Sequence, residues 1–377
     1  MQIAMLAAGF SAGEADQLRR AMAAWKRKGG LEKFEDKLIS GMLARNYTRE
    51  FAEAIFRQIQ GFAEYGFPES HAASFALLAY ASSWLKRHEP AAFLAALLNS
   101  QPMGFYSPSQ LVQDAKRHGA EVRPIDACIS GWDAALESSA NDRPAVRLGL
   151  NMVRGLPAEA ACRIEEARAI RPFSDLHDMA IRAQLTRSDL QVLAAANALE
   201  SLAGHRRQAL WQAMAGAAEA GLLKHAPIAE PELRLAAPSE AENIVGDYRS
   251  FGLTLGRHPV ALLRPMLTKK RFLPAEVLNT FANGQLARGC GLVTVRQRPE
   301  TARGTMFVTL EDETGVVNVI AWPDLVERQR RELLGSSLLG VYGIWQCERN
   351  VRHLVAKRLV DLSTLLGSLS ARSRNFC

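Results

Sequence analysis

The spacing of apolar residues changes once along this chain of 377 residues, and the change constrains the fold more than any other feature. Apolar residues recur at helical spacing through most of the chain, whereas the stretch from Cys290 onward alternates with the period of two that is typical of strands. The chain is therefore predicted to contain a mainly α part followed by a separate all-β domain. Its length allows about two to three domains, each with its own core.

The C-terminal part contains five candidate strands with one helical stretch between the third and the fourth. The strands are expected at Cys290–Arg296, Met306–Leu310, Val316–Ala321, Leu338–Trp345 and His353–Leu359, and the helical stretch at Leu325–Leu334. Five strands with a helix after the third is the order of an OB-fold barrel. The predicted fold class is multi-domain, mainly α, followed by an all-β OB-fold barrel.

Composition and charge exclude several classes of protein. Lys and Arg outnumber Asp and Glu by 46 to 39, a formal net charge of +7 that is compatible with a polyanionic partner. The five cysteines are scattered and never spaced as C-x-x-C, which excludes a disulfide framework and a cysteine zinc site. The most apolar stretch, His71–Leu85, is too short to cross a bilayer, and the N-terminus does not resemble a signal peptide. A cytoplasmic chain without membrane contact is expected.

The predicted barrel carries cations and aromatic residues suited to single-stranded nucleic acid. An OB barrel binds single strands by combining a basic groove with aromatic rings on which bases stack. We expect this groove to include Arg296, Arg298, Phe307, Trp322, Arg349, Arg352 and Lys357. The alternative is that the aromatic rings belong to the core and that the cations form only a solvated face.

A second candidate site lies at Val153–Arg168, which resembles a helix-hairpin-helix element. Such an element presents backbone N–H groups at a helix N-terminus to a DNA phosphate. Pro157 stands where the motif usually has glycine, and it removes one of these donors. A further copy around Thr186–Gly204 lacks a clear Gly-x-Gly hairpin, so a structural helical hairpin is the alternative for each copy. The predicted DNA contacts are Arg154, Gly155 and Leu156.

Two features of the N-terminal part point to phosphate or nucleotide contacts. Arg19, Arg20 and Lys26 form a basic helical face, and arginine is a bidentate partner for phosphate. A Gly-aromatic-Pro turn then opens a helix of small residues that has Ser70 and His71 at its start. We expect these five residues to contact nucleotide or template. The alternatives are a solvated face for the cations and a structural role for the histidine.

The stretch Gly66–Ala76, with its continuation through Ser83–Lys86 and Pro90–Asn99, resembles the fingers region of bacterial C-family polymerases, the DNA polymerase III alpha group. Within that group, Gln101–Ser107 and the closing Ser373–Phe376 resemble the error-prone branch. The resemblance covers essentially the whole chain in order. It implies the C-terminal part of the fingers at 1–100, an α/β connector at 101–144, tandem helix-hairpin-helix at 145–215, a linker and helical segment at 216–285, the OB-fold at 286–362 and a C-terminal tail at 363–377. The tail is polar and is expected to be loose.

Members of this family copy DNA by two-metal phosphoryl transfer, in which palm aspartates hold Mg²⁺. The sequence contains no D-x-D pair, so the resemblance implies the C-terminal part of such an enzyme without its catalytic palm. We therefore expect no catalytic residue, no metal ligand and no cofactor in this chain, and no polymerisation by the chain alone. Mg²⁺ is implied for the full-length polymerase.

The resemblance also implies a function and partners. The function is error-prone translesion DNA synthesis in damage-induced mutagenesis. The partners are primer–template and single-stranded template DNA, an incoming dNTP held together with the palm, and an inactive Y-family-like polymerase. Gln208–Gln212 does not complete the sliding-clamp pentapeptide of replicative members, so we expect clamp binding to be weak or to run through that polymerase partner. A non-catalytic DNA-binding scaffold and a fragment of a replicative alpha subunit remain alternatives.

Overall fold

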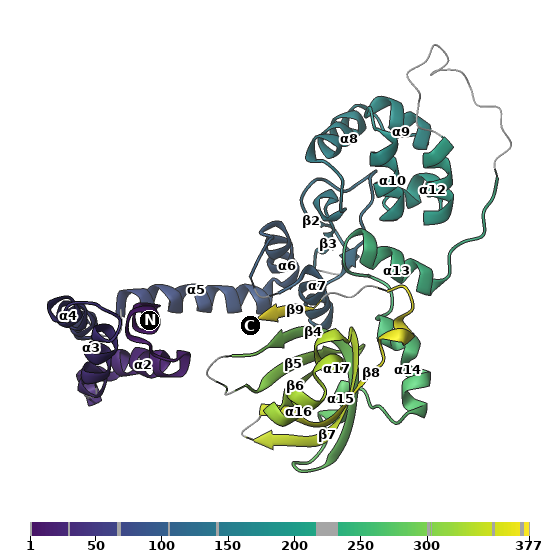
Figure 1. The fold of residues 1–377 in the computed structure, drawn as a ribbon. Helices are drawn as coiled ribbons and strands as arrows, with labels where there is room; N and C mark the ends of the chain where they lie inside the picture. The colour runs from purple at the N-terminus through teal and green to yellow at the C-terminus, as the bar shows by residue number, and fades with distance from the viewer. Residues whose placement is uncertain are drawn as a thin grey trace.

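The computed structural model describes residues 2–28, 31–65, 69–104, 106–140, 143–215, 233–299, 302, 304–348, 351–369 and 373–376. Figure 1 shows a helical head at the N-terminus, a long helix that leads away from it, a block of helices with a small sheet, and a β-barrel. The N-terminal part is helical and the C-terminal domain is a barrel, as the change in apolar spacing predicts.

The head consists of short helices around a small core of its own. Leu18, Leu38 and Met42 are fully buried in this core. Gly41 permits the close crossing of two helices, because a Cβ at this position would lie 2.0 Å from the carbonyl oxygen of Ala8. The elements of the head are α1 (Gln2–Ala8), α2 (Ala12–Lys28), η1 (Glu32–Phe34), α3 (Glu35–Leu43) and α4 (Arg49–Tyr65).

Helix α5 (Glu69–His88) connects the head to the rest of the molecule (Figure 1). Its residues from Ala73 to His88 are all exposed, although many of them are apolar. Pro90 begins α6 (Pro90–Asn99), and Ser107 caps α7 (Pro108–Arg117) in a capping box with Gln110.

The connector and the predicted hairpin region form one block with a shared core. Val112 of the connector and Ile164, Met179 and Leu193 of the helices are buried in the same cluster. A small sheet with strand order β1-β3-β2 adds Val146 to this cluster. The elements are β1 (Val122–Arg123), β2 (Ala135–Glu137), β3 (Ala145–Arg147), η2 (Leu150–Met152), α8 (Ala158–Ile170), α9 (Leu176–Arg182), α10 (Arg187–Ala195), α11 (Glu200–Ala203) and α12 (Arg206–Ala215).

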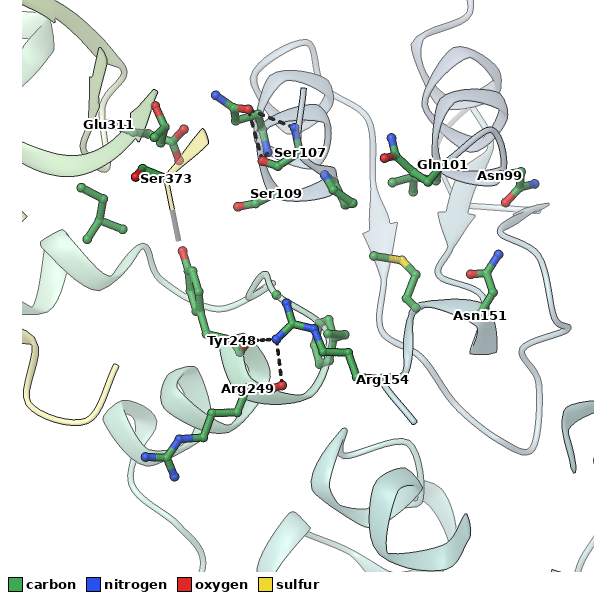
Figure 2. A pocket seen from close by; sticks show the side chains of 18 of the residues that line it. Asn99, Gln101, Ser107, Ser109, Asn151, Arg154, Tyr248, Arg249, Glu311 and Ser373 are labelled. Carbon is green, nitrogen blue, oxygen red and sulfur yellow. Dashed lines mark hydrogen bonds between the residues drawn. The ribbon is translucent and has the colours of Figure 1, made fainter. Parts of the chain in front are cut away.

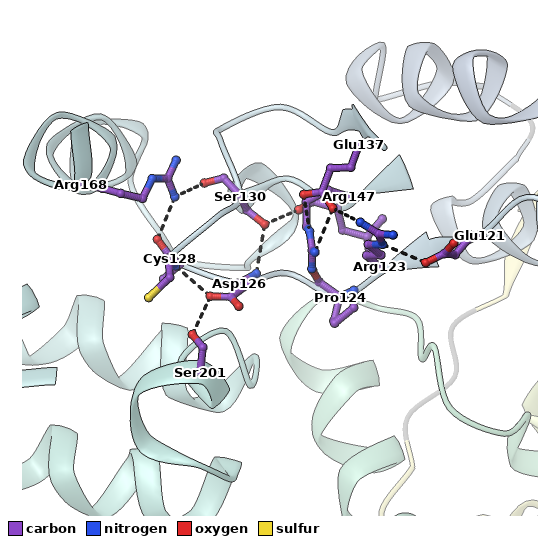
Figure 3. A network of polar contacts seen from close by, with 12 residues as sticks. Glu121, Arg123, Pro124, Asp126, Cys128, Ser130, Glu137, Arg147, Arg168 and Ser201 are labelled. Atoms are coloured by element: carbon purple, nitrogen blue, oxygen red, sulfur yellow. Dashed lines mark hydrogen bonds and ion pairs between the residues drawn. The ribbon is translucent and has the colours of Figure 1, made fainter. Parts of the chain in front are cut away.

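Polar side chains fasten the small sheet within this block (Figure 3). Glu137 accepts hydrogen bonds from the guanidinium groups of Arg147 and Arg123. These bonds, with that from Arg147 the stronger influence, lower the pKa of Glu137 although burial opposes them. Arg168 of α8 donates to the backbone carbonyls of Ala127 and Ser130. The connector and the first hairpin helix are therefore tied together by both core and polar contacts.

In the described residues 233–285, between the block and the barrel, lie the helices α13 (Glu240–Ser250), α14 (Pro259–Lys269) and α15 (Ala275–Leu278). Ser239 and Glu242 form the capping box that starts α13, which lies in the stretch 216–285 expected to hold a linker and a helical segment. The guanidinium of Arg264 on α14 bonds to the carboxylates of Asp312 and Glu313 in the turn after β5. This contact holds α14 against the barrel.

The C-terminal domain is a closed barrel of five strands. The strands are β4 (Leu286–Gln297), β5 (Met306–Glu311), β6 (Val316–Ala321), β7 (Leu338–Glu348) and β8 (Val351–Asp361), with α16 (Pro323–Arg328) and α17 (Arg330–Gly335) after the third strand. The order β5-β6-β8-β7-β4 closes on itself because β4 also pairs with β5. This order, with β6 and β8 parallel, is the OB topology, so the predicted fold class is confirmed.

The C-terminal tail differs from the prediction that it is loose. After η4 (Ser363–Leu366), residues Arg374–Phe376 form β9, which pairs in parallel with Val295–Gln297 of β4. The C-terminal half of β4 extends beyond its pairing with β7. Its backbone N–H and C=O groups on that side can therefore pair with another strand. The tail forms hydrogen bonds with these groups. Periodicity does not predict this strand, because the segment is short and polar.

Candidate nucleic-acid interface

The outer face of β5 and β6 carries a row of apolar side chains. Along β5, Met306, Val308 and Leu310 are buried in the barrel, so Phe307 and Thr309 between them face outward. The register places Phe307 opposite Ile320 of β6, and Ile320 beside Val355 of β8. Trp322 follows directly after β6 and is 52% exposed. The rings of Phe307 and Trp322 are therefore on or next to the strand-2 and strand-3 face, with which OB-folds bind oligonucleotides.

One cation predicted from the sequence lies beside this face, and two others are exposed on β8. Arg298 is exposed in the connection from β4 to β5, which ends beside Phe307. Arg352 and Lys357 are exposed on β8. Arg349 lies outside the described residues. The structure thus brings Arg298 to the same end of the barrel as Phe307, while the function of each cation stays a prediction.

Arg296 occupies a different place from the one the sequence suggested. Its side chain is buried, and the guanidinium donates to the backbone carbonyls of Leu333 and Ser336 and to the hydroxyl of Ser373. Burial lowers the pKa of this arginine. Because its donors are used inside the protein, Arg296 joins α17 and the tail to β4 and is not part of the exposed groove that the sequence predicts.

The first predicted hairpin has a backbone that requires glycine. Gly155 has φ of +84°, Leu156 is buried, and Pro157 is the N-cap of α8. The guanidinium of Arg154 donates to the carbonyl oxygens of Tyr248 and Arg249, at 3.1 and 3.0 Å. Arg154 thereby fastens the hairpin to α13, at the wall of a cavity of about 870 Å³ between the block and the barrel (Figure 2).

A second hairpin repeats this geometry, and sequence analysis missed where it begins. Gln184 has φ of +50°, Leu185 is buried and Thr186 is the N-cap of α10, in the same order as Gly155, Leu156 and Pro157. The spacing of Thr186 and Asp189 predicts the start of α10 correctly. A glutamine at position 184 does not predict a left-handed backbone, because glycine is the usual residue in that conformation. The Nε of Arg163 on α8 donates to the Ala183 carbonyl at 2.9 Å, so the two hairpins form one unit.

In the head, Arg19 and Arg20 lie on the solvent side of α2, with side chains that are 62% and 69% exposed. Both bond to Asp16, and these bonds lower the pKa of its carboxyl group. Part of the charge of this face is therefore already balanced. The side chains of Lys26, Ser70 and His71 lie outside the described residues, and the grouping of the five predicted contacts stays a prediction.

Among the described residues, no group of three or more His, Cys, Asp or Glu side chains is arranged to hold a metal ion. The carboxylate of Asp312 is used by Arg264 and by the backbone N–H of Ala275. Within the same residues, no helix combines the length and apolarity needed to cross a membrane.

Comparison with known families identifies the class of protein. Residues 1–46 match the finger domain of the bacterial DNA polymerase III alpha subunit, residues 119–209 match a helix-hairpin-helix motif, and residues 290–362 match an OB-fold nucleic acid binding domain. The finger, helix-hairpin-helix and OB-fold matches follow one another along the chain in the predicted order.

The relatives specify the branch. An error-prone DNA polymerase of Bordetella parapertussis is 65% identical over all of this chain, and that of Burkholderia pseudomallei is 64% identical. The chain spans 36% of the length of each of these relatives. It corresponds to part of an error-prone DNA polymerase, which confirms the resemblance stated from the sequence. A solved asparaginyl-tRNA synthetase from Pyrococcus horikoshii matches 21% of the chain at 21% identity with a TM-score of 0.19, and no argument rests on it.

Proposed function

We propose that this chain is the DNA-binding portion of an error-prone translesion DNA polymerase. The observation that supports this most directly is the outer barrel face with Phe307 and Trp322, in a chain 65% identical to error-prone DNA polymerases. Bases of a single-stranded template stack on these rings, and Arg298 and Arg352 neutralise neighbouring phosphates. The whole protein is a cytoplasmic DNA-directed DNA polymerase that needs Mg²⁺ and acts in damage-induced synthesis.

The helix-hairpin-helix unit has a supporting part in this proposal. Arg163 of α8 holds the turn before α10, and each of the two helices starts three residues after a left-handed residue, Gly155 or Gln184. Backbone N–H groups at such helix starts bind phosphates independently of sequence. The hairpins hold duplex DNA, while the fingers position the incoming dNTP for a palm that this chain does not supply.

The protein partners in this proposal follow from the error-prone branch. An inactive Y-family-like polymerase binds the whole protein and supplies contact with the sliding clamp. In this chain the amide of Gln208 is buried and bonded to the backbone of Leu233 and Leu235. This internal use supports a clamp contact that is weak or made through the partner.

The experiment measures binding of labelled oligothymidine to the full chain at low salt. Trp322→Ala removes one stacking ring and is expected to weaken binding by about 1–3 kcal/mol. Tyr106→Ala in the connector is the matched control, since Tyr106 is 60% exposed and lies outside both the barrel and the hairpins. A wild-type chain that does not bind, or equal losses in the two variants, would refute the proposal.

A further inference from the structure

Two arginines flank Tyr342 on the outer face that β4, β7 and β8 form, away from β5 and β6. The strand register places Arg288 of β4 opposite Tyr342 of β7, and Tyr342 opposite Arg358 of β8. The guanidinium carbons of Arg288 and Arg358 lie 5.1 and 5.6 Å from the centre of the Tyr342 ring. These are cation–π distances, so the ring orders two guanidinium groups on neighbouring strands.

The C-terminal end of α14 brings three more cations to this face. Phe272 packs edge-on against Tyr342, with 5.3 Å between ring centres, and the N–H of Leu273 donates to the Arg288 carbonyl at 2.9 Å. The residues just before Phe272 are exposed cations. We call the five cations together the Tyr342 patch, namely Lys269, Lys270, Arg271, Arg288 and Arg358.

Arg271 stands at a position where the backbone favours glycine. Its φ is +61°, and the N–H of Phe272 donates to the carbonyl of Leu267, which closes the end of α14. Glycine is the usual residue at such a left-handed helix end, because a Cβ there is strained. The chain keeps a cation in the patch at a position where glycine would be less strained.

The charges of the Tyr342 patch are not balanced within the described part of the molecule. None of its five cations forms an ion pair with a described acidic side chain, whereas Arg264 on the same helix is paired with Asp312 and Glu313. A β-bulge in β8 between its pairings with Tyr342 and Gly343 also leaves Lys357 exposed beside Arg358. The face therefore presents clustered, uncompensated positive charge.

We infer that the Tyr342 patch is a second nucleic-acid surface, which binds the phosphodiester backbone of single-stranded DNA. The inference goes beyond the proposed stacking face on β5 and β6, because it places contacts on the other strands of the barrel. The ligand is a polyphosphodiester rather than a protein, because Phe272 is buried and Tyr342 is largely covered by cations. Protein interfaces need an apolar centre, whereas phosphate contacts need only cations.

The first test uses Arg288→Gln with Arg358→Gln and oligothymidine binding over a series of salt concentrations. Each lost phosphate contact lowers the slope of log affinity against log salt by about 0.7, so the double variant is expected to lose about 1.4. Arg117→Gln with Arg143→Gln is the matched control, because both residues are exposed in the connector and the change in net charge is equal. An unchanged slope, or an equal loss in the control, would overturn the inference.

Arg271→Gly provides a test in which a cation is removed but no buried side chain is lost. The variant relieves the left-handed backbone, so its melting temperature should not fall, while its salt slope should drop by about 0.7. A stable variant with wild-type slope would overturn the inference, as would stronger binding of polyglutamate than of oligothymidine. If Trp322→Ala weakens DNA binding and the patch variants do not, the proposed function stands and this inference fails; if the wild-type chain does not bind, both fail.

Discussion

The barrel and helix α5 place their apolar residues in opposite ways. In the barrel, Trp345 is 1% exposed and Val341 is fully buried. On α5, Leu77 and Tyr80 are each 73% exposed, and Phe75 and Trp84 are about half exposed. Large apolar side chains in the two segments therefore differ completely in burial.

The difference in burial follows from the closure of the barrel. A barrel pairs each strand on both sides and encloses one face of every strand, so its core is complete within its own sequence. A single helix cannot bury apolar residues that lie all around it, and such helices are normally covered by other elements. In this chain α5 spans from the head to α6 with its middle exposed (Figure 1). The comparison shows that burial here is set by topology and not by hydrophobicity alone.

The largest expected effect separates two tryptophans. Trp345→Ala empties the centre of the barrel core and should destabilise the barrel by about 3–5 kcal/mol. Trp84→Ala removes the same side chain from α5 and should change stability by about 0.5 kcal/mol, because the ring is already 47% exposed. Hydrogen exchange of barrel amides and urea unfolding measure the two effects. Equal losses would mean that α5 is packed as firmly as the barrel.

A smaller effect tests whether the barrel depends on the buried hydrogen bonds of Arg296. Arg296→Met keeps most of the volume but leaves the carbonyls of Leu333 and Ser336 without their donor, which should destabilise the barrel by about 2–3 kcal/mol. Oligothymidine affinity per folded molecule should stay the same, since this guanidinium is buried. Arg298→Met is the matched control and should show the reverse pattern. Weaker DNA binding by folded Arg296→Met would instead support the sequence prediction that Arg296 contacts DNA.

The smallest effect concerns backbone rather than packing. Gly155→Ala should destabilise the hairpin block by about 1 kcal/mol because of its left-handed backbone, whereas Gln184→Gly should be neutral or slightly stabilising. Gly13→Ala in α2 is the control, since this glycine is helical with open space around it and alanine should stabilise the helix. Thermal unfolding measures all three variants. The same sign of change for Gly155→Ala and Gly13→Ala would contradict the proposed role of the hairpin turn.

Much of the fold was predictable because it depends on local pattern. Alternating residues gave the strand Val316–Ala321 at its observed bounds, and the other four barrel strands within a few residues. The candidate site was less predictable, since Phe307 and Trp345 look alike in sequence. Phe307 faces outward and Trp345 faces inward only because of the register between strands, which a one-residue shift would reverse. The domain boundaries and the roles of the predicted contacts stay predictions.

The sequence by itself determined the element types, the order of the domains and the relationship to error-prone polymerases, because periodicity, caps and motifs are local properties. Tertiary structure alone decided that Arg296 is buried, that the tail pairs with β4, and that Gln184 repeats the turn of Gly155. It also placed Arg288 and Arg358 against the ring of one tyrosine, Tyr342. Each of these depends on which distant backbone or side chain lies opposite, and that is fixed only when the strands and helices pack.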